Sequence, residues 1–363
     1  MNFTYDVLAG RVVFGVGSRR SLADEAAALG SRRVLVVADA AEDAIAAEVT
    51  GILGELVVGR FSDVAQHVPI AQAEAAISQA RQIEADTVVT IGGGSATGFG
   101  KIIARSLHVN LIAVPTTYAG SEMTDIWGLT EGDHKQTGKD ARVKPNVVVY
   151  DPELTLTLPA FIAGPSGMNA MAHAVEALYG PGANPVVSAM AVESIAALYT
   201  GLPVVVAEPE NLDGRSHVLY GAYLAAVSLA GTGTALHHKT CHVLGGMFNL
   251  NHGDMNAVVL GHALAYNAPA IPECMDRIAG AVGVEAPGVP GAMFDLAAAI
   301  GAPTSLEAIG MPADGLEEAA RRVVIEAAAN VRPPEEGGIR QMLDNAYFGR
   351  RPVGPPSTKG TTS

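Results

Sequence analysis

Short runs of valine, isoleucine and leucine recur along the first 150 residues, and segments with the period of an amphipathic helix separate them. Continuous apolar strands that alternate with helices are typical of a parallel sheet, because helices then cover both of its faces. This part of the chain is therefore predicted to be an α/β domain that binds ligands at the carboxyl ends of its strands. The predicted strands are residues 34–38, 56–58, 87–91, 111–114 and 147–150, and helical patterns between them include residues 70–83 and 97–107.

The segment DPELTLTLP, residues 151–159, marks a change of pattern, because no strand pattern recurs after it. The residues that follow are rich in alanine and keep the helical period, which predicts an all-helical domain. The last residues, GRRPVGPPSTKGTTS, have no apolar anchors, which is typical of disordered tails. We therefore expect an α/β domain with a parallel sheet at residues 1–153, an all-α domain at 154–350 and a disordered tail at 351–363.

The net charge of −14 argues against nucleic acid and anionic membranes as partners, because both are polyanions. We expect no apolar run of membrane-span length, and Asp6 stands where a secretory signal would be basic and then apolar. Two cysteines, Cys241 and Cys274, are too few for a disulfide framework. These features predict a cytoplasmic protein, and they leave a small anionic substrate possible.

Two loops after predicted strands suit parts of a dinucleotide. Asp39 follows the first strand, where a carboxylate accepts hydrogen bonds from a ribose diol and repels a 2′-phosphate; an ordinary helix N-cap is the equal alternative. IGGGSATGFGK, residues 91–101, places three consecutive glycines before a helix, so backbone amides can approach a pyrophosphate. Its spacing is neither that of a Walker A loop nor that of a Rossmann loop, and the alternative is a tight strand-to-helix turn.

A third loop, VPTTYAGSEMT at residues 114–124, gathers small hydrogen-bond donors after a strand. It is either part of a ligand site or a polar turn. Four cations follow it, and we expect most of them to be solvated while one reaches a phosphate or a carboxylate. The donors are Thr116, Thr117, Tyr118 and Ser121, and the cations are Lys135, Lys139, Arg142 and Lys144.

Four of the ten histidines lie within residues 234–258, TALHHKTCHVLGGMFNLNHGDMNAV. His238 and His242 are four residues apart and share one face of a helix that Gly245 and Gly246 are expected to end. Imidazoles brought together from several helices are typical of a metal site or of a site that handles protons. Buried histidines that each make one hydrogen bond are the alternative, and the clustering favours the site. The candidates are His237, His238, His242 and His252, with His173 upstream in GMNAMAHAVEAL.

Taken together, GGGS, PTTYAGSE, DPELTLTLP, GMNAMAHAVEAL and HHKTCHVLGG followed by NHGD resemble the iron-containing alcohol dehydrogenase superfamily. The resemblance runs in order from residue 1 to about residue 350, and it implies a dinucleotide-binding α/β domain, a helical catalytic domain and a homodimer. SATGFGK, PTTYAGSEMT before IWGLTEG, SGMNA and ALHHKTCH are similar to the maleylacetate reductase family. That similarity implies reduction of the C=C bond of maleylacetate, a small dicarboxylate, to 3-oxoadipate with NADH or NADPH in aromatic compound degradation.

The resemblance also implies roles for single residues. Metal-dependent members bind iron or zinc through one aspartate and three histidines, and Asn169 stands at the aspartate position, so we expect no metal here. Asn169 and Tyr118 are then expected to bind substrate, with His242 as proton donor. The other expected catalytic residues are His173, His238 and His252, which polarise the substrate oxygen; the expected cofactor-binding residues are Asp39, Gly93, Gly94, Ser95, Thr116, Thr117, Ser121 and Lys135.

Two other functions remain open on the sequence. One is a metal-dependent alcohol or polyol dehydrogenase of the same superfamily, because three histidines, an amide and water can hold zinc. The other is a non-catalytic dinucleotide-binding sensor, which would have no need of the full set of histidines.

Overall fold

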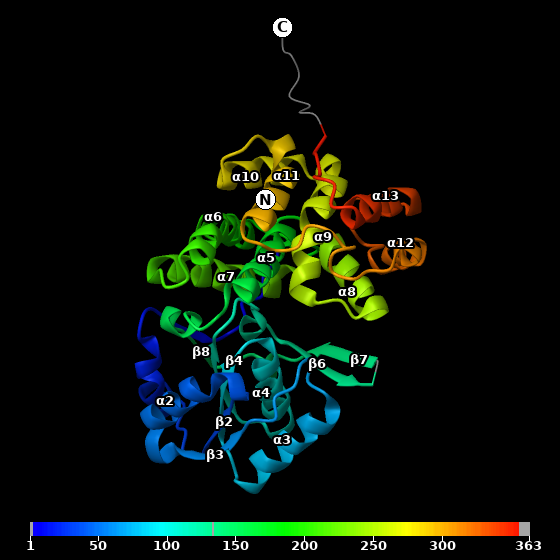
Figure 1. Ribbon diagram of the computed structural model, residues 1–363. Coiled ribbons are helices and arrows are strands. Elements are labelled where there is room, and N and C mark those ends of the chain that lie inside the picture. The colour runs from blue at the N-terminus through cyan, green and yellow to red at the C-terminus, as the bar shows by residue number, and fades with distance from the viewer. Residues whose placement is uncertain (1–2, 133, 356–363) are drawn as a thin grey trace. The chain divides into compact units, whose positions relative to one another are not determined.

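The computed structural model describes residues 3–132 and 134–355 (Figure 1). Its chain divides into two compact units, and the division falls at Leu158 and Pro159, inside the DPELTLTLP segment. The first, called the sheet unit here, is Asp6–Leu158. The second, called the helical unit, contains the described residues from Pro159 onward together with those before Asp6.

The sheet unit is built on six parallel strands in the order β1-β8-β5-β4-β2-β3. This arrangement confirms the predicted parallel α/β domain. β1 was not foreseen, because RVVF is short and two of its residues are exposed. The strands are β1 (Arg11–Phe14), β2 (Val34–Val37), β3 (Val57–Phe61), β4 (Thr87–Gly92), β5 (Asn110–Pro115) and β8 (Val147–Tyr150).

Helices cover both faces of this sheet, and alternate strand residues supply the two cores. Val34 and Val36 of β2 pack with α1 (Leu22–Ala28) and α2 (Asp43–Leu53) on one face. Leu35 and Val37 pack with α3 (Ile70–Gln82) and α4 (Gly94–Leu107) on the other. An antiparallel hairpin of β6 (Ile126–Glu131) and β7 (His134–Lys139) follows β5 and was also missed, since half of its residues are polar.

Nine α-helices, three short 3-10 helices and no strand form the helical unit within its described residues, which confirms the predicted all-helical domain. α5 is the central one, because every residue from Gly167 to Ala177 is buried. A large apolar cluster joins α8, α9, α12 and α13. The helices are α5 (Ala160–Ala177), α6 (Pro185–Ala207), α7 (Leu212–Thr232), α8 (Leu236–Phe248), α9 (His252–Asn267), α10 (Pro272–Val282), α11 (Val289–Ala299), α12 (Leu316–Glu326) and α13 (Glu336–Tyr347).

Three expectations about the helical part are wrong. Gly245 and Gly246 do not end α8, which continues to Phe248 and stops where Asn249 adopts a left-handed conformation. α6 is long and apolar enough to cross a membrane by length and composition, with a mean hydropathy of 1.6, and 44% of that window is buried within the protein. The bent pair of α7 and α8 passes the same test of length and composition.

The third expectation that is wrong is the disordered tail at 351–363, because its first residues are ordered. Arg351 forms a bidentate ion pair with Asp295, with N–O distances of 2.8 and 2.6 Å. The backbone N–H of Gly354 donates to the carbonyl of Pro287 at 3.0 Å, and Pro352 is buried. These contacts anchor residues 351–355, which carry few apolar side chains; residues 356–363 of the predicted tail lie outside the described residues.

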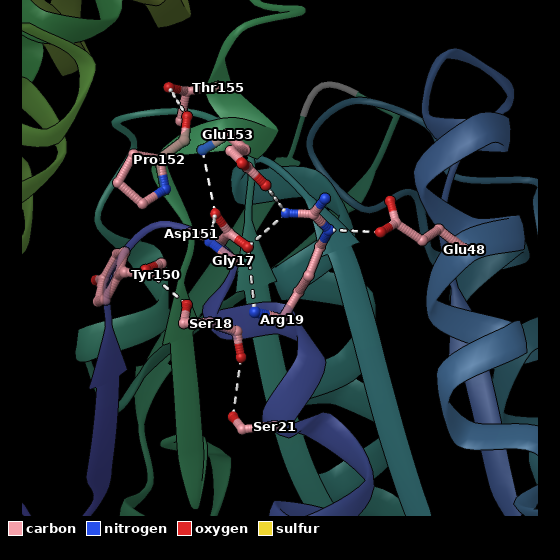
Figure 2. Close-up of polar contacts among 10 residues, drawn as sticks. All are labelled: Gly17, Ser18, Arg19, Ser21, Glu48, Tyr150, Asp151, Pro152, Glu153 and Thr155. Carbon is pink, nitrogen blue, oxygen red and sulfur yellow. Dashed lines mark hydrogen bonds and ion pairs between the residues drawn. The ribbon is translucent and has the colours of Figure 1, made fainter. Parts of the chain in front are cut away.

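The DPELTLTLP segment has a structural role in the sheet unit (Figure 2). Asp151, fully buried at the end of β8, accepts hydrogen bonds from the backbone N–H groups of Gly17 and Arg19 and from the Arg19 guanidinium. The same guanidinium contacts Glu48 and Glu153. Three carboxylates around one arginine fix the turn after β1 to the end of β8.

Candidate active site

The glycine-rich loop joins β4 to α4 in the sheet unit. β4 ends at Gly92, whose φ of 132° lies in the region that favours glycine, and α4 begins at Gly94. Gly93 is the N-cap, and no described side chain caps this end of the helix, so its first amide groups remain available as donors. With Ser95 in the first turn, the loop has the geometry of an anion-binding helix N-terminus.

The two glycines at this helix end have different surroundings. A Cβ atom at Gly93 would lie 2.9 Å from Oγ1 of Thr117, so the glycine loop and the PTTYAGSE loop pack closely at this point. A Cβ atom at Gly94 would have Cβ of Ala119 as its nearest neighbour, at 3.7 Å, which is an ordinary contact. Packing within the protein therefore requires a glycine at position 93 but not at position 94.

The loop after β2 carries two acids. Asp39 caps the short 3-10 helix η2 (Ala40–Glu42), since its carboxylate accepts from the backbone N–H of Ala41 at 2.8 Å. This is the N-cap alternative, and a carboxylate has lone pairs left for a ribose hydroxyl. Glu42, which the sequence did not single out, accepts from the hydroxyl of Thr116 at 2.6 Å, and burial raises its pKa. A Cβ atom at Gly92 would lie 4.0 Å from this carboxylate, so Glu42 brings all three loops together.

A buried lysine organises the third loop, and sequence reasoning missed it. Lys101 of α4 has no exposed surface, and its Nζ donates to the carbonyl oxygens of Ser121 and Ile126 and to the hydroxyl of Thr124, at 2.7, 2.7 and 2.9 Å. Burial lowers its pKa to about 7. Tyr118, predicted to bind substrate, is only 1% exposed and belongs to the core of the sheet unit.

Two of the four cations after this loop, Arg142 and Lys144, have different partners. Arg142 pairs with Asp140, and Nζ of Lys144 donates to the carbonyl of Ala9 at 3.2 Å. Lys139 is exposed on β7. Lys135 lies on the same strand, and its side chain is outside the described part of the structure.

In the helical unit, α5 and α8 bring the predicted histidines together. The rings of His173 on α5 and His238 on α8 are stacked, with centroids 4.6 Å apart and planes 13° apart. His237 packs edge-on against His238 at 4.8 Å. His242, one turn further along α8, has its ring centroid 6.4 Å from that of His238. The two segments separated in sequence therefore form one imidazole cluster.

These imidazoles differ in burial. His173, His237 and His238 are buried, and desolvation together with the neighbouring imidazoles lowers the pKa of His173 and His238 well below the ordinary value and that of His237 to about 3. His242 on α8 is exposed, and so is His252, the first residue of α9. Burial therefore disfavours the protonated form of the three buried rings.

Three polar atoms, two of this cluster and one of Asn169 on the same helix as His173, are buried and have no hydrogen-bond partner among the described residues. They are Oδ1 of Asn169, Nδ1 of His173 and Nε2 of His238. Asn169 and His173 are four residues apart on α5 and share one face. A buried polar atom without a partner costs about 1–3 kcal/mol, so three such atoms together indicate a ligand site. Their atom types suit either a hydrogen-bonding ligand or a divalent cation.

His242 also faces a cavity of about 450 Å³ between α8 and α12. Its lining includes Met247 from α8 and Arg322 and Glu326 from α12. The cavity therefore presents an imidazole and charges of both signs.

Glu176, another residue that the sequence did not single out, supports the cluster. It is 1% exposed, and its carboxylate accepts from Nδ1 of His238 at 2.7 Å and from the backbone N–H groups of Ala235 and His237 at 3.0 and 2.7 Å. Glu176, His237 and His238 place ligand-type atoms within 4.8 Å of one another, but these atoms already bond to one another and to the backbone. We therefore regard Glu176 as a support for the imidazoles, and Asn169, His173 and His238 as the open side of the site.

Comparisons with known proteins agree with this geometry. The family model described as iron-containing alcohol dehydrogenase matches residues 9–152, and the model of the C-terminal part of the same family matches residues 164–347. A maleylacetate reductase of Sphingobium indicum is 47% identical over 97% of this chain and 99% of its own. The crystal structure of maleylacetate reductase from Agrobacterium tumefaciens is 42% identical, covers 97% of this chain and 100% of its own, and has a TM-score of 0.93.

The fold extends to more distant proteins. Sulfoacetaldehyde reductase from Bifidobacterium kashiwanohense, solved in complex with NAD+, has a TM-score of 0.89 at 22% identity, with coverage of 95% of this chain and 99% of its own. The matching family is described as iron-containing, so the comparisons do not support the expectation that this chain binds no metal. The matches cover both units with nearly complete overlap, and the chain is an oxidoreductase that belongs to the iron-containing alcohol dehydrogenase family, in its maleylacetate reductase branch.

Proposed function

We propose that this oxidoreductase reduces the C=C bond of maleylacetate to give 3-oxoadipate, with NADH or NADPH, in the degradation of aromatic compounds. The names of relatives at 47% identity support this substrate. The observation that carries the proposal is the buried group of Asn169, His173 and His238 with its unpartnered atoms. In this group the neutral Asn169 stands where metal-dependent relatives have an aspartate. The side-chain NH2 group of Asn169 can donate to a substrate carboxylate that an aspartate would repel, whereas its unpartnered Oδ1 only accepts.

The cofactor is proposed to bind along the three loops of the sheet unit. The uncapped N-terminus of α4, with Gly93, Gly94 and Ser95, would take the pyrophosphate. Asp39 would accept from the adenosine ribose and disfavour a 2′-phosphate, so we expect NADH to serve at least as well as NADPH. We propose that Thr116 and Thr117 contact the adenine side of the cofactor, and that Ser121 and Lys135 contact it near the nicotinamide ribose.

The chemistry is a hydride transfer followed by a protonation. Hydride from C4 of the nicotinamide adds to the alkene carbon β to the ketone, and the electron pair of the C=C bond moves to form an enolate. The developing charge on the ketone oxygen needs donors, and His173 and His252 are proposed to supply them. His242 is proposed to protonate the enolate carbon, which completes the reduction. Asn169 is proposed to hold the substrate.

Iron is the cofactor that the family name implies. Oδ1 of Asn169, Nδ1 of His173 and Nε2 of His238 are atom types that would hold a divalent ion, which acts as a Lewis acid on a carbonyl oxygen. Asparagine at the aspartate position removes a full negative charge from this set, and weakens it for iron relative to the carboxylate form. We propose that turnover does not require a metal. The test is to measure turnover before and after exhaustive chelation, together with the metal content of the purified protein.

The deciding experiment follows nicotinamide absorbance in both directions, and compares oxidation of NADH by maleylacetate with reduction of NAD+ by simple alcohols and polyols. Rapid NADH loss with maleylacetate that survives chelation supports the proposal. Activity on alcohols that chelation abolishes would instead support the metal-dependent alcohol dehydrogenase, which the unpartnered ligand-type atoms and the family name favour as the second candidate. Binding of NADH without turnover of any substrate would favour the sensor. We further propose that the protein is cytoplasmic and forms a homodimer. Light scattering of the purified protein would test the dimer.

A further inference from the structure

Glu176 is a buried carboxylate that contacts His238 of the imidazole cluster through a hydrogen bond. It lies on α5, seven residues after Asn169, and both of its oxygens are engaged. Oε1 accepts from the backbone N–H of His237 at 2.7 Å, and Oε2 accepts from that of Ala235 at 3.0 Å. Backbone N–H groups only donate, so each oxygen of Glu176 acts as an acceptor toward the backbone.

This arrangement determines which nitrogen of His238 carries the proton. Nδ1 of His238 has two neighbours, Oε2 of Glu176 at 2.7 Å and Nδ1 of His237 at 3.3 Å. Nε2 of His237 lies 3.1 Å from the carbonyl oxygen of Asn256, and a carbonyl only accepts, so the proton of a neutral His237 is on Nε2. Nδ1 of His237 is then a lone pair, and both neighbours of Nδ1 of His238 are acceptors.

We propose that Glu176 is a positioning residue that fixes neutral His238 in the tautomer with its proton on Nδ1. Nε2 then carries a lone pair, and this is the buried atom that has no partner within the described protein. A carboxylate that orients a histidine in this way is a general means of setting which ring nitrogen faces a ligand.

The consequence deepens the proposed function and rests on it. In this tautomer His238 accepts a hydrogen bond through Nε2 and does not donate one, so it cannot polarise the ketone oxygen while it is neutral. Donation to the enolate oxygen then falls to His173, His252 or His242. His238 instead suits a hydrogen-bond donor of the ligand, such as a hydroxyl group or a bound water molecule.

Glu176 also has a structural role that an experiment must separate from the tautomer. α8 begins after Ala235 without a side-chain cap of its own, and Glu176 takes the place of that cap from α5. Its replacement therefore removes hydrogen bonds from the start of α8 as well as from His238. A loss of activity alone would not distinguish the two roles, whereas the position of a proton on one ring would.

The test is nitrogen NMR of the whole protein with 15N-labelled histidine side chains, with the His238 signals assigned by comparison with His238→Asn. In the wild type we expect a protonated-type shift for Nδ1 of His238 and a lone-pair-type shift for Nε2. Glu176→Gln offers an amide that can donate to Nδ1, so it should raise the population with the proton on Nε2. Glu122→Gln, which changes a buried carboxylate of the sheet unit, should leave the His238 signals unchanged.

A wild-type spectrum with the proton of His238 on Nε2 would overturn the proposal, as would a Glu176→Gln protein that folds and keeps the wild-type shifts. The wild-type spectrum decides even if that variant does not fold. The measurement needs no substrate, so its failure is distinct from failure of maleylacetate turnover. In the assay, Glu176→Gln should lower kcat by about 10–100-fold and leave the KM for NADH unchanged.

Discussion

The glycine at position 94 separates two explanations of the loop between β4 and α4. If Gly94 is there for the protein's own packing, a methyl group should destabilise the fold; if it is there for a ligand, the methyl group should weaken binding only. A Cβ atom at this position would meet Cβ of Ala119 at 3.7 Å, so Gly94→Ala introduces no strain. Since alanine is favoured over glycine in a helix, the unfolding free energy should stay the same or rise by up to about 1 kcal/mol.

Cofactor binding should respond in the opposite direction. A methyl group on the first residue of α4 would hold a phosphate away from the amide groups there, and a lost hydrogen bond to a charged group is worth about 1.5–3 kcal/mol. That loss corresponds to an increase in the Kd for NADH of about 10–150-fold. Titration calorimetry gives the Kd and urea denaturation gives the stability.

Gly51→Ala is the matched control, because Gly51 lies inside α2 and the space around its Cβ position is open. It should gain stability in the same way and bind NADH as the wild type does. If Gly94→Ala has the wild-type Kd, the loop is a tight turn and the pyrophosphate assignment is refuted. If Gly94→Ala unfolds easily, the packing argument is refuted.

Four other predictions test the remaining assignments. Asp39→Ala should shift the ratio of kcat/KM toward NADPH by removing repulsion of the 2′-phosphate, and an unchanged ratio would show that Asp39 is only the cap of η2. Asn169→Asp should raise the zinc content and lower maleylacetate turnover, with KM rising more than kcat falls; a variant that stays metal-free and fully active would exclude its placement near substrate. His242→Ala should lower kcat by about 10²–10⁴-fold with an unchanged Kd for NADH, and a wild-type kcat would remove it as the proton donor. Burial lowers the pKa of Lys101 to about 7 from 10.5. Between these values the unfolded state binds a proton that the folded state does not, so the stability of the wild type relative to Lys101→Met should rise with pH by about 1.4 kcal/mol per unit. Urea denaturation from pH 7 to pH 9 measures this slope, and a difference independent of pH would contradict it.

The strands of the sheet were predictable because their pattern is local. A strand buried on both faces needs consecutive apolar residues, as in Val34–Val37 and Val147–Tyr150, and such runs are visible without any knowledge of the fold. β1 and the hairpin of β6 and β7 were missed because their exposed positions interrupt that pattern. Tail residues such as Pro352 and Gly354 are held by contacts with distant residues, which no local pattern records.

Lys101 and Glu176 were missed for a related reason. A single charged residue on a helix is most often a solvated one, and both lie on helices. A signal existed in each case, since Glu176 stands alone among the apolar residues of AMAHAVEAL and Lys101 precedes two isoleucines. A lone charge inside an apolar helical run indicates burial, and burial requires partners.

The sequence by itself determined the parallel sheet, the helical second half, the glycine loop and the histidine-bearing segments, because each depends on the order of neighbouring residues. The tertiary structure decided which histidines are buried and which protein groups face their nitrogens. His238 is separated from Glu176 by 62 residues, and yet this contact decides where the proton of His238 lies. Protonation depends on burial and on the nearest charges and hydrogen-bond partners, and these are set by the packing of α5 against α8 and α9.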